Sequence, residues 1–291
     1  MPNFFVIFNP AARGEKSQRL RRFLELKAGA DVTLAPTQRA GDATRLAAEG
    51  AAAGYKVIVA AGGDGTINEV VNGIGVSGVS LGVLPLGTAN VFARELRIPM
   101  SLSRAWSVLE QQRSRLLDLA LAEFGGDRRY FVQLAGVGLD AQAVRLARWE
   151  LKKRLGPLCY VWAGLEALRT RTSPVEVVGE DGAVLAAGAA VLVGNGRFYG
   201  GPLRLFPRAQ LDDGLLDVCV FEKVGYLGAA RHALGVLCGI HTRWWGVKYF
   251  QSARFTCRAA ASAPVQLDGE DVGNTPVTFT VLPKALRVIV P

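Results

Sequence analysis

Histidine and cysteine are scarce in this chain. Its 291 residues include two histidines and four cysteines. No two cysteines form a CxxC pair, so neither a zinc site nor a disulfide framework is indicated. We therefore expect a cytoplasmic protein with reduced thiols in its core. The four cysteines are Cys159, Cys219, Cys238 and Cys257.

Long hydrophobic runs are missing as well. No run approaches the roughly 18 uninterrupted apolar residues that a transmembrane helix needs. Residues 1–10, MPNFFVIFNP, lack the basic start of a secretion signal and are interpreted as a first strand. The sequence thus predicts a chain without a transmembrane segment.

Positive charge is in excess. The chain has 34 Lys and Arg residues against 25 Asp and Glu residues, a formal charge of +9. This excess suits nucleic acid, an anionic membrane or nucleotide phosphates, and it does not choose among them. No helix-turn-helix, RRM or KH signature accompanies it, so we expect no nucleic-acid partner. The motif G-x-x-x-x-G-K-[ST] of P-loop kinases does not occur either.

The first part of the chain alternates apolar runs with helical patterns. Expected strands cover residues 3–8, 32–34, 57–61 and 79–84, and expected helices lie at 17–27, up to 52, from 66, at 89–96 and at 101–112. This alternation predicts an open parallel sheet covered on both faces. Ligands of such sheets bind at the carboxyl ends of the strands.

The second part of the chain has mostly strand patterns. We expect strands at 116–124, 129–134, 175–178, 187–194, 216–221, 253–257, 265–267 and 277–290, with helical inserts at 141–171 and 226–240. An antiparallel sandwich or barrel follows from this pattern. The predicted domains are therefore residues 1–118 and 119–291, with a return of the last strand to the first domain left open.

The sequence VIVAAGGDGTINEVVNGIG, at residues 57–75, reads as a strand, a glycine loop and a helix. Thr66 and Glu69 have the spacing of a capping box at the start of the helix. Glycines before a helix N-terminus make a phosphate site, and Asp64 could act there through Mg²⁺ or by polarising an attacking hydroxyl or water. The alternative is an ordinary turn-rich loop with a surface Asp.

Several motifs occur in a characteristic order. AGGDGTINEVVNGI is followed one strand later by PLGTANVFAREL, with NP-x-x-x-G upstream and LDGE near the end. Together they resemble the diacylglycerol kinase catalytic-domain family, the bacterial soluble lipid kinases related to sphingosine and ceramide kinases. The resemblance covers nearly the whole chain. NAD kinases share the GGDGT loop but lack GTANVFARE.

The resemblance implies a fold and a set of site residues. The fold is α/β plus β: an open parallel ATP-binding domain of the NAD kinase and diacylglycerol kinase type, then an antiparallel β-sandwich lipid-binding domain. The implied ATP-site residues are Asn9, Thr37, Gly62, Gly63, Asp64, Gly65, Thr66, Ile67, Asn68 and Thr88.

The resemblance also implies catalytic carboxylates. Asp268 would be the base, with Glu270 beside it, because phosphorylating a hydroxyl needs a carboxylate within hydrogen-bond reach. Mg²⁺ near Asp64 would neutralise the phosphoryl group, helped by Lys16 or Arg94. The alternative for Asp268 is a hairpin turn, since Asp-Gly is a strong turn signal.

Residues 210–217 resemble the structural metal loop of the family, PxAxxxDGLL. By position the ligands would be Asp213 and the backbone carbonyls of Gln210 and Leu215, an oxygen-only set that suits Mg²⁺ or Ca²⁺. A turn between strands is the alternative. Asp140 falls where the relatives place a polar cleft residue, and a helix-capping role is the alternative for it.

Two stretches mix basic and aromatic residues, 145–154 and 241–250. Both suit a peripheral membrane surface, and a solvated helix face or a partly buried aromatic cluster is the alternative for each. We therefore predict an ATP- and Mg²⁺-dependent kinase that phosphorylates a hydroxyl of a diacylglycerol-like or sphingoid lipid at a membrane. A catalytically silent nucleotide- or lipid-binding protein and an NAD kinase are the alternatives. The oligomeric state stays open, with a homodimer among the options.

Overall fold

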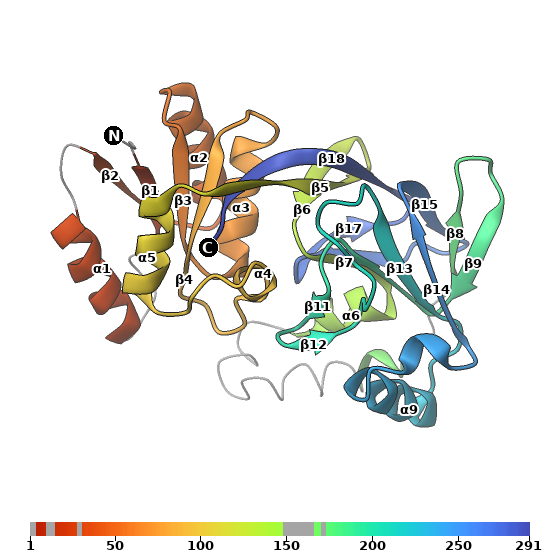
Figure 1. Cartoon of the computed structure of the whole chain (residues 1–291). Helices are drawn as coiled ribbons and strands as arrows, with labels where there is room; N and C mark the ends of the chain where they lie inside the picture. The colour runs from red at the N-terminus through yellow and green to blue at the C-terminus, as the bar shows by residue number, and fades with distance from the viewer. Residues whose placement is uncertain (1–3, 10–14, 28–30, 148–165, 170–172) are drawn as a thin grey trace. The chain divides into compact units, whose positions relative to one another are not determined.

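The structure, a computed structural model, describes residues 4–9, 15–27, 31–147, 166–169 and 173–291 (Figure 1). The chain forms two compact units. Unit 1 comprises Met1–Leu119, Gly200–Pro202 and Pro283–Pro291, and unit 2 comprises Ala120–Tyr199 and Leu203–Leu282. Unit 1 is a mixed α/β fold with a parallel sheet and unit 2 is an antiparallel β-sandwich, so the predicted fold class is confirmed.

Unit 1 alternates strands and helices along the chain. Its elements are β1 (Phe4–Phe8), α1 (Glu15–Lys27), β2 (Val32–Pro36), α2 (Asp42–Ala52), β3 (Val57–Gly62), α3 (Asp64–Ile74), β4 (Ser80–Pro85), α4 (Val91–Glu95) and α5 (Leu102–Gln111). The strand order β2-β1-β3-β4 is parallel throughout. Strand β18 (Val277–Ile289) adds Arg287 and Val288 beside β4, again in parallel.

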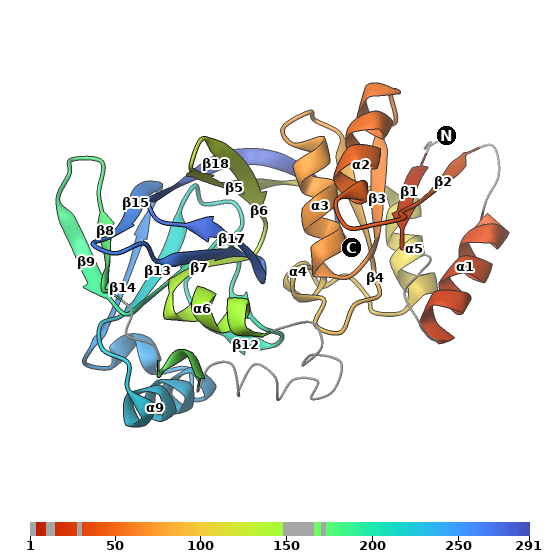
Figure 2. The ribbon, with the colours of Figure 1, turned by 180° about the vertical axis from the view of Figure 1, so that it is seen from behind.

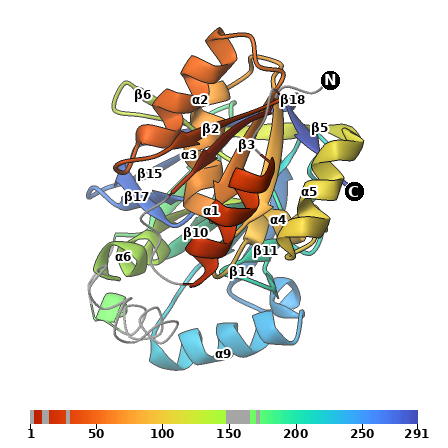
Figure 3. The same ribbon diagram turned by 90° about the vertical axis from the view of Figure 1, so that its left-hand side faces the viewer.

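Helices cover both faces of this sheet. Phe4 and Phe5 are neighbours on β1, so their side chains point to opposite faces. The ring of Phe4 lies 5.5 Å from that of Trp106 in α5. Phe5 packs against Gly50 of α2, where a Cβ atom would lie 2.9 Å from the Phe5 ring. Figures 2 and 3 show α2 and α3 on one side of the strands and α5 on the other.

Unit 2 contains strands of two large sheets and one two-stranded sheet. Its elements are β5 (Ser114–Phe124), β6 (Asp127–Phe131), β7 (Leu134–Gly138), α6 (Leu139–Leu146), β8 (Val175–Val178), β9 (Val184–Gly188), β10 (Ala190–Gly194), β11 (Phe198–Tyr199), β12 (Leu203–Arg204), β13 (Leu216–Phe221), α9 (Tyr226–Leu237), η1 (His241–Arg243), β14 (Val247–Ser252), β15 (Arg254–Ala259), β16 (Pro264–Leu267), β17 (Glu270–Asn274) and the first part of β18. One sheet has the antiparallel order β14-β13-β10-β7-β16-β17. In the other, β15 pairs with β18 and β8, and β8 pairs with β9.

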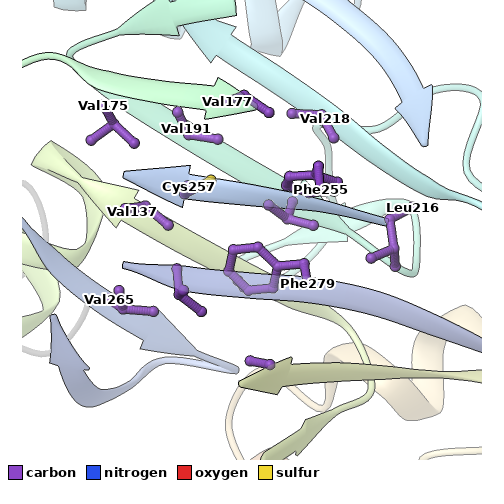
Figure 4. Packing of buried hydrophobic residues seen from close by; sticks show 14 of the residues in the cluster. Val137, Val175, Val177, Val191, Leu216, Val218, Phe255, Cys257, Val265 and Phe279 are labelled. Carbon is purple, nitrogen blue, oxygen red and sulfur yellow. The ribbon is translucent and has the colours of Figure 1, made fainter. Parts of the chain in front are cut away.

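The main core of unit 2 lies between these two sheets. Figure 4 shows Val137, Val191 and Val218 of the first sheet together with Phe255 and Phe279 of the second. Alternate residues of the first sheet point the other way. They form a second cluster that includes Leu134, Leu192, Cys219 and Phe221. Strands β10 and β13 are thus buried on both faces, which explains the apolar sequence AVLVG of β10 and the sequence LDVCVF of β13, which is apolar apart from Asp217.

Three local predictions need correction. The single strand expected at 187–194 is two strands, β9 and β10, which belong to different sheets. The sequence analysis also misses β7, whose small residues LAGVG hide a central strand. Cys238 is exposed, whereas Cys219 and Cys257 are buried as expected, and Cys159 lies outside the described residues.

The helix expected at 141–171 begins as α6, while 148–165 and 170–172 lie outside the described residues. Within the part of the chain that the structure describes, every helix is too short or too polar to cross a bilayer.

Truncating Phe279 should destabilise the protein strongly. Its side chain is fully buried, and its ring lies 5.9 Å from Phe131 and 5.5 Å from Phe255. We expect Phe279→Ala to lower the free energy of unfolding by about 3–5 kcal/mol. Val184→Ala, at a half-exposed position of β9, should change it by less than about 0.5 kcal/mol. Urea unfolding measures both values, and equal losses would contradict the assignment of the core.

Candidate functional site

The glycine loop of unit 1 joins the end of β3 to the start of α3. Gly62 ends the strand, Asp64 begins the helix, and Gly63 alone lies between them. The backbone of Gly63 is extended, so the chain passes directly from strand to helix. The first N–H groups of a helix lack intrahelical acceptors and form the positive end of its dipole. This end of α3 can therefore hold an anion against the backbone.

A second glycine loop, residues 86–90, follows β4 and packs against the first. A Cβ atom on Gly87 would lie 2.7 Å from the Cα atom of Gly63. A side chain on Gly63 or on Gly87 would therefore force one of the two loops to move. Asn90 fixes the second loop, because its side-chain amide donates an N–H to the carbonyl oxygen of Gly87 at 2.8 Å. The motifs GGDG and GTAN thus share one backbone surface.

Asp64 connects the same two loops. Its carboxylate accepts the N–H of Phe92, in α4, at 3.2 Å. Burial raises the pKa of the Asp64 carboxyl, and backbone N–H groups of residues 90–92 oppose that rise. The carboxylate is therefore anchored beside the two glycine loops.

The predicted capping box of α3 is wrong. The helix begins at Asp64, two residues before the expected start at Thr66, and Gly63 is its N-cap. Glu69 reaches α2 instead, where its carboxylate accepts the N–H of Ala43 at 3.0 Å. The two helices lie very close, since a Cβ atom on Gly73 would be 2.3 Å from a carbonyl oxygen of α2. Glu69 therefore joins two helices rather than capping one.

Other residues of the predicted ATP site follow the carboxyl ends of the parallel strands. Asn9 follows β1, Thr37 follows β2, and Thr88 is exposed in the loop after β4. The N–H of Thr37 bonds to the carbonyl oxygen of Phe8 at 2.9 Å. Asp42 closes the next turn by accepting the N–H groups of residues 38 and 39, at 2.8 and 3.1 Å. The loops after β1 and β2 are thus held next to each other.

Two members of the predicted set point inward. The side chain of Ile67 is fully buried, and its N–H bonds to the carbonyl oxygen of Gly63 at 3.1 Å. Asn68 is buried and accepts an N–H from Asn72 at 3.1 Å. Gly65 and Thr66 are partly exposed in the first turn of α3. The side chains of Ile67 and Asn68 thus serve packing, and residues 63–66 form the accessible part of the loop.

A cavity of about 550 Å³ adjoins the second glycine loop in unit 1. Its lining includes Thr88, Asn90, Arg94 and Ser101. The Nε atom of Arg94 donates to the carbonyl oxygen of residue 89 at 2.8 Å, which fixes the guanidinium near this loop. Hydroxyl, amide and guanidinium groups together suit a polar, anionic ligand. The side chain of Lys16, the other predicted cation, lies outside the described part of the structure.

Asp268 and Gly269 form the two-residue turn between β16 and β17. Their φ angles, +47° and +87°, are those of a type I′ turn, so the predicted hairpin is present. The Asp268 carboxylate folds back onto the chain before β7. Oδ2 accepts the N–H of Val132 at 2.9 Å, and Oδ1 accepts those of Gln133 and Leu134 at 3.0 and 2.9 Å. Three backbone donors thus fix the position of this carboxylate.

Glu270, the neighbouring predicted catalytic residue, begins β17 and is exposed. The next residue, Asp271, binds Arg145 of α6 through two hydrogen bonds of 2.7 Å. Arg145 also donates to the carbonyl oxygen of Gly273 at 3.0 Å. Arg145 therefore makes its described contacts within unit 2, and its role at a membrane surface stays a prediction. Residues 148–154 of that predicted surface lie outside the described residues.

Asp140 does not cap α6, whose N-cap is Gly138 and which has no side-chain cap bond. Its carboxylate accepts the hydroxyl of Tyr199 at 2.5 Å and an N–H of Gln266 at 2.9 Å. Burial raises the pKa of the Asp140 carboxyl. The sequence does not predict Tyr199 or Gln266, which are 59 and 126 residues away from Asp140. No spacing pattern could join them, because only the fold brings them together.

A larger cavity, of about 590 Å³, lies in unit 2. Its walls come from β10, β13 and α9 and are mostly apolar, on the second-cluster side of the sheet. The polar side chains among its lining residues are those of Asp140, Tyr199, Tyr226 and His232. Burial lowers the pKa of His232, whose ring packs 4.8 Å from Phe221. An apolar cavity with a few hydrogen-bonding groups suits a ligand that is mostly hydrocarbon.

The predicted metal loop precedes β13. Oδ1 of Asp213 accepts the N–H of Leu215 at 3.1 Å, so the turn is present. The amide of Gln251 donates to Asp217 at 3.2 Å and lies 3.5 Å from Asp213, bridging the two carboxylates. Burial raises the pKa of the Asp217 carboxyl, and the charge on Asp213 raises it further. With the carbonyls of Gln210 and Leu215, these groups offer the oxygen-only donors that Mg²⁺ or Ca²⁺ prefers.

Two models of known protein families together match most of the chain. The family model described as the diacylglycerol kinase catalytic domain matches residues 3–122. The model described as the YegS C-terminal NAD kinase beta sandwich-like domain matches residues 133–290.

Individual relatives span the whole chain. A probable lipid kinase YegS-like protein of Pseudomonas aeruginosa strain PAO1 is 36% identical, with 98% of this chain and 93% of that protein covered. The diacylglycerol kinase of Bacillus subtilis strain 168 is 33% identical, with 98% and 95% covered. The crystal structure of a diacylglycerol kinase from Bacillus anthracis strain Sterne has a TM-score of 0.77 at 26% identity, with 99% and 97% covered.

The buried carboxyl of Asp140 should give stability a distinct pH dependence. Its pKa is raised in the folded state, so its stabilising contribution is present below the unfolded pKa and is lost as pH rises through the folded pKa. Asp140→Asn cannot titrate, and its amide can still accept from Gln266 and donate to Tyr199. We expect the unfolding free energy of the variant, relative to the parent, to increase with pH above the ordinary range of an Asp carboxyl. Urea unfolding at a series of pH values measures this difference.

Asp127→Asn, at an exposed carboxyl of β6, is the matched control. Parallel pH profiles for Asp140→Asn and the parent would contradict the interpretation.

Proposed function

Because this chain belongs to the diacylglycerol kinase catalytic-domain family, and is thus a phosphotransferase with an alcohol group as acceptor, we propose that it transfers the γ-phosphoryl group of ATP to a lipid hydroxyl. The acceptor is a diacylglycerol-like or sphingoid lipid at a membrane surface. The contact between Gly63 and Gly87, at the N-terminus of α3, is the observation that carries the proposal. It leaves a backbone surface that a triphosphate can approach closely.

In this proposal, unit 1 holds the nucleotide. Residues 63–66 present N–H groups to the phosphates, and Thr88 and Arg94 line the adjoining polar cavity. Asn9 and Thr37 bind the nucleotide from the neighbouring strand ends. Bound Mg²⁺ neutralises phosphate charge, and the Asp64 carboxylate, anchored beside both glycine loops, is its proposed protein ligand. A Cβ atom on Gly63 would lie 3.2 Å from the Cα atom of Gly87, so a side chain there would press on the second loop.

Asp268 is the proposed general base. Its carboxylate takes the proton of the acceptor hydroxyl while the oxygen attacks phosphorus and ADP leaves. The three backbone N–H donors support this role because they fix the position and orientation of the carboxylate. Glu270, exposed two residues later, would assist from the same hairpin.

The large cavity of unit 2 is the proposed site for the hydrocarbon part of the lipid. Its walls are mostly apolar, and none of its described lining residues is Lys or Arg. A neutral head group therefore suits it better than an anionic one. Asp140 and Tyr199 lie at this cavity and could bind an acceptor hydroxyl.

Two further features complete the proposal. The loop with Gln210, Asp213 and Leu215 binds a structural Mg²⁺ or Ca²⁺, which its oxygen donors suit. The protein is cytoplasmic and associates peripherally with the membrane, where its lipid acceptor resides. The NAD kinase alternative loses support because the relatives at 33–36% identity are lipid kinases by name. A silent binding protein stays the alternative in which Asp268 only anchors the hairpin.

Phosphate transfer from γ-labelled ATP to a panel of lipids in mixed micelles tests the function. We expect labelled phospholipid in at least one tube containing diacylglycerol, ceramide or a sphingoid base, and none in a parallel tube with NAD. Omitting Mg²⁺ should abolish transfer. Labelled NADP would refute the lipid-kinase proposal. MgATP binding without labelled product for any lipid would favour the silent binding protein.

Asp268→Asn should separate catalysis from nucleotide binding. Loss of a general base lowers turnover by about 10²–10⁴-fold. We expect that loss with an unchanged Kd for MgATP, because the nucleotide residues belong to unit 1. The contrasting control is Gly63→Val, whose side chain enters the space beside Gly87 and should weaken MgATP binding itself.

Asp268 also holds three N–H donors, so cooperative unfolding of the variant must be checked alongside turnover. Turnover within tenfold of the parent would remove Asp268 from the mechanism.

A further inference from the structure

Helix α9 and the turn after it expose an unusual number of large apolar side chains. Leu227 is 89% exposed, Leu234 is 57% exposed, and Trp245 is 86% exposed. Leu227 and Leu234 are seven residues apart, so they lie on the same face of the helix. Ile240, between the helix and η1, is exposed as well. Exposing these four apolar side chains to water is unfavourable in free energy. A partner that covered them would remove this cost.

The same helix forms a wall of the apolar cavity. Ala229, Ala233 and Val236 line the cavity with the spacing of a second helix face. Tyr226 and Leu237 lie at the two ends of α9. Both line the cavity and are also exposed to solvent, by 54% and 69%. The cavity therefore opens to the outside along α9. One face of the helix touches the cavity and the adjacent face meets solvent.

Packing holds the turn firmly against the helix. His241 is fully buried, and its Nε2 atom bonds to the carbonyl oxygen of Leu205 at 2.8 Å. Trp244 packs on Gly235, where a Cβ atom would lie 3.0 Å from the indole ring. Arg231 of α9 lies over the same indole, 5.3 Å from its centroid, and donates to the carbonyl oxygen of Trp245. The exposed side chain of Trp245 is thus presented on a fixed backbone.

The charged side chains within this segment of the chain are all basic. Between Lys223 and Lys248 the sequence contains Arg231 and Arg243 but no Asp or Glu. Lys223 and Arg243 are exposed beside the apolar side chains. Lys248 is 3.9 Å from Glu222, the acidic residue just outside the segment. Basic groups flanking an apolar helix face, with a tryptophan at its edge, match the interface of a bilayer that contains anionic lipid.

We propose that α9 and the turn through Trp245 form a docking surface for an anionic membrane. The surface consists of Leu227, Leu234, Ile240 and Trp245 with the flanking Arg231 and Arg243. This inference rests on the proposed lipid-kinase function for its biological setting, since docking here places the open side of the cavity against the source of the acyl chains. The membrane partner is favoured over a protein partner by the basic residues of this segment, which contains no Asp or Glu, and by the opening of the cavity at the same helix. Figure 3 shows α9 running lengthwise along the edge of unit 2.

Cosedimentation with vesicles tests the surface without any need for turnover. The variant Leu227→Ser/Leu234→Ser removes two exposed side chains that do not line the cavity. With vesicles of phosphatidylcholine and phosphatidylglycerol, we expect partitioning to fall on the order of tenfold. Arg243→Gln should reduce binding to these vesicles and leave binding to pure phosphatidylcholine unchanged, because it removes only charge attraction. The melting temperature of both variants should equal that of the parent.

The matched control is Val184→Ser, an apolar residue of β9 that is 50% exposed in the same unit. It should bind vesicles within about twofold of the parent, since β9 is not part of the surface. Unchanged vesicle binding by the double Leu variant, or an equal loss with Val184→Ser, would overturn the proposal. So would a parent dimer, seen by light scattering, that the double variant dissociates while vesicle binding stays the same.

Kinase activity on lipid dispersed in micelles separates this inference from the proposed function. The double Leu variant should phosphorylate micellar lipid at the parental rate and lose activity on vesicle-embedded lipid. Parental activity on both would overturn the docking surface and leave the kinase proposal intact. Absence of activity in the parent, together with α9-dependent vesicle binding, would overturn the kinase proposal alone.

Discussion

Close approach of two backbones, at Gly63 and Gly87, is the constraint on which the proposed phosphate-binding edge of unit 1 depends. The contact requires two strands to end at the same level and two loops to lack side chains at the point of closest approach. Asp64 and Asn90 then hold the loops in place, one through an N–H of α4 and the other through the carbonyl oxygen of Gly87. The Asp in the glycine loop, which is unexpected beside a phosphate, is thus also a structural link. A substitution at either glycine would therefore disturb the contacts of Asp64 and Asn90 as well as the backbone surface that the two loops share.

A hairpin turn and a catalytic base are compatible readings of the motif LDGE. Positive φ angles at Asp268 and Gly269 reverse the chain, and the same geometry turns the Asp268 carboxylate toward three N–H groups before β7. The contacts therefore give the carboxylate a fixed place, which is what a base requires of its surroundings. They also mean that any substitution of Asp268 alters the fold locally. Structure and chemistry at this residue have to be measured separately.

The sequence predicted those features that depend on neighbours along the chain. The parallel α/β order, the strand into Gly62 and the turn at Asp268 all follow from short patterns, and the family motifs added the order in which they occur. Features that depend on distant residues were not predictable. Asp140 meets Tyr199 and Gln266 only because α6, β11 and β16 belong to one folded unit. Strand β7 has the sequence LAGVG, whose two glycines and one alanine give little strand signal. Glu69, which was predicted to cap α3, instead accepts a hydrogen bond from α2, which packs on α3.

Strand β18 also determines when unit 1 can be completed during synthesis. Its residues 277–281 contribute to the core of unit 2, whereas Arg287 and Val288 pair with β4. During synthesis, β4 therefore has no strand on its outer side until the end of β18 has left the ribosome. That happens long after residues 1–119 have been made. Up to that point the edge of β4 exposes unpaired N–H and C=O groups, which other chains can recognise. The sheet of unit 1 therefore begins to form first along the chain and is completed last.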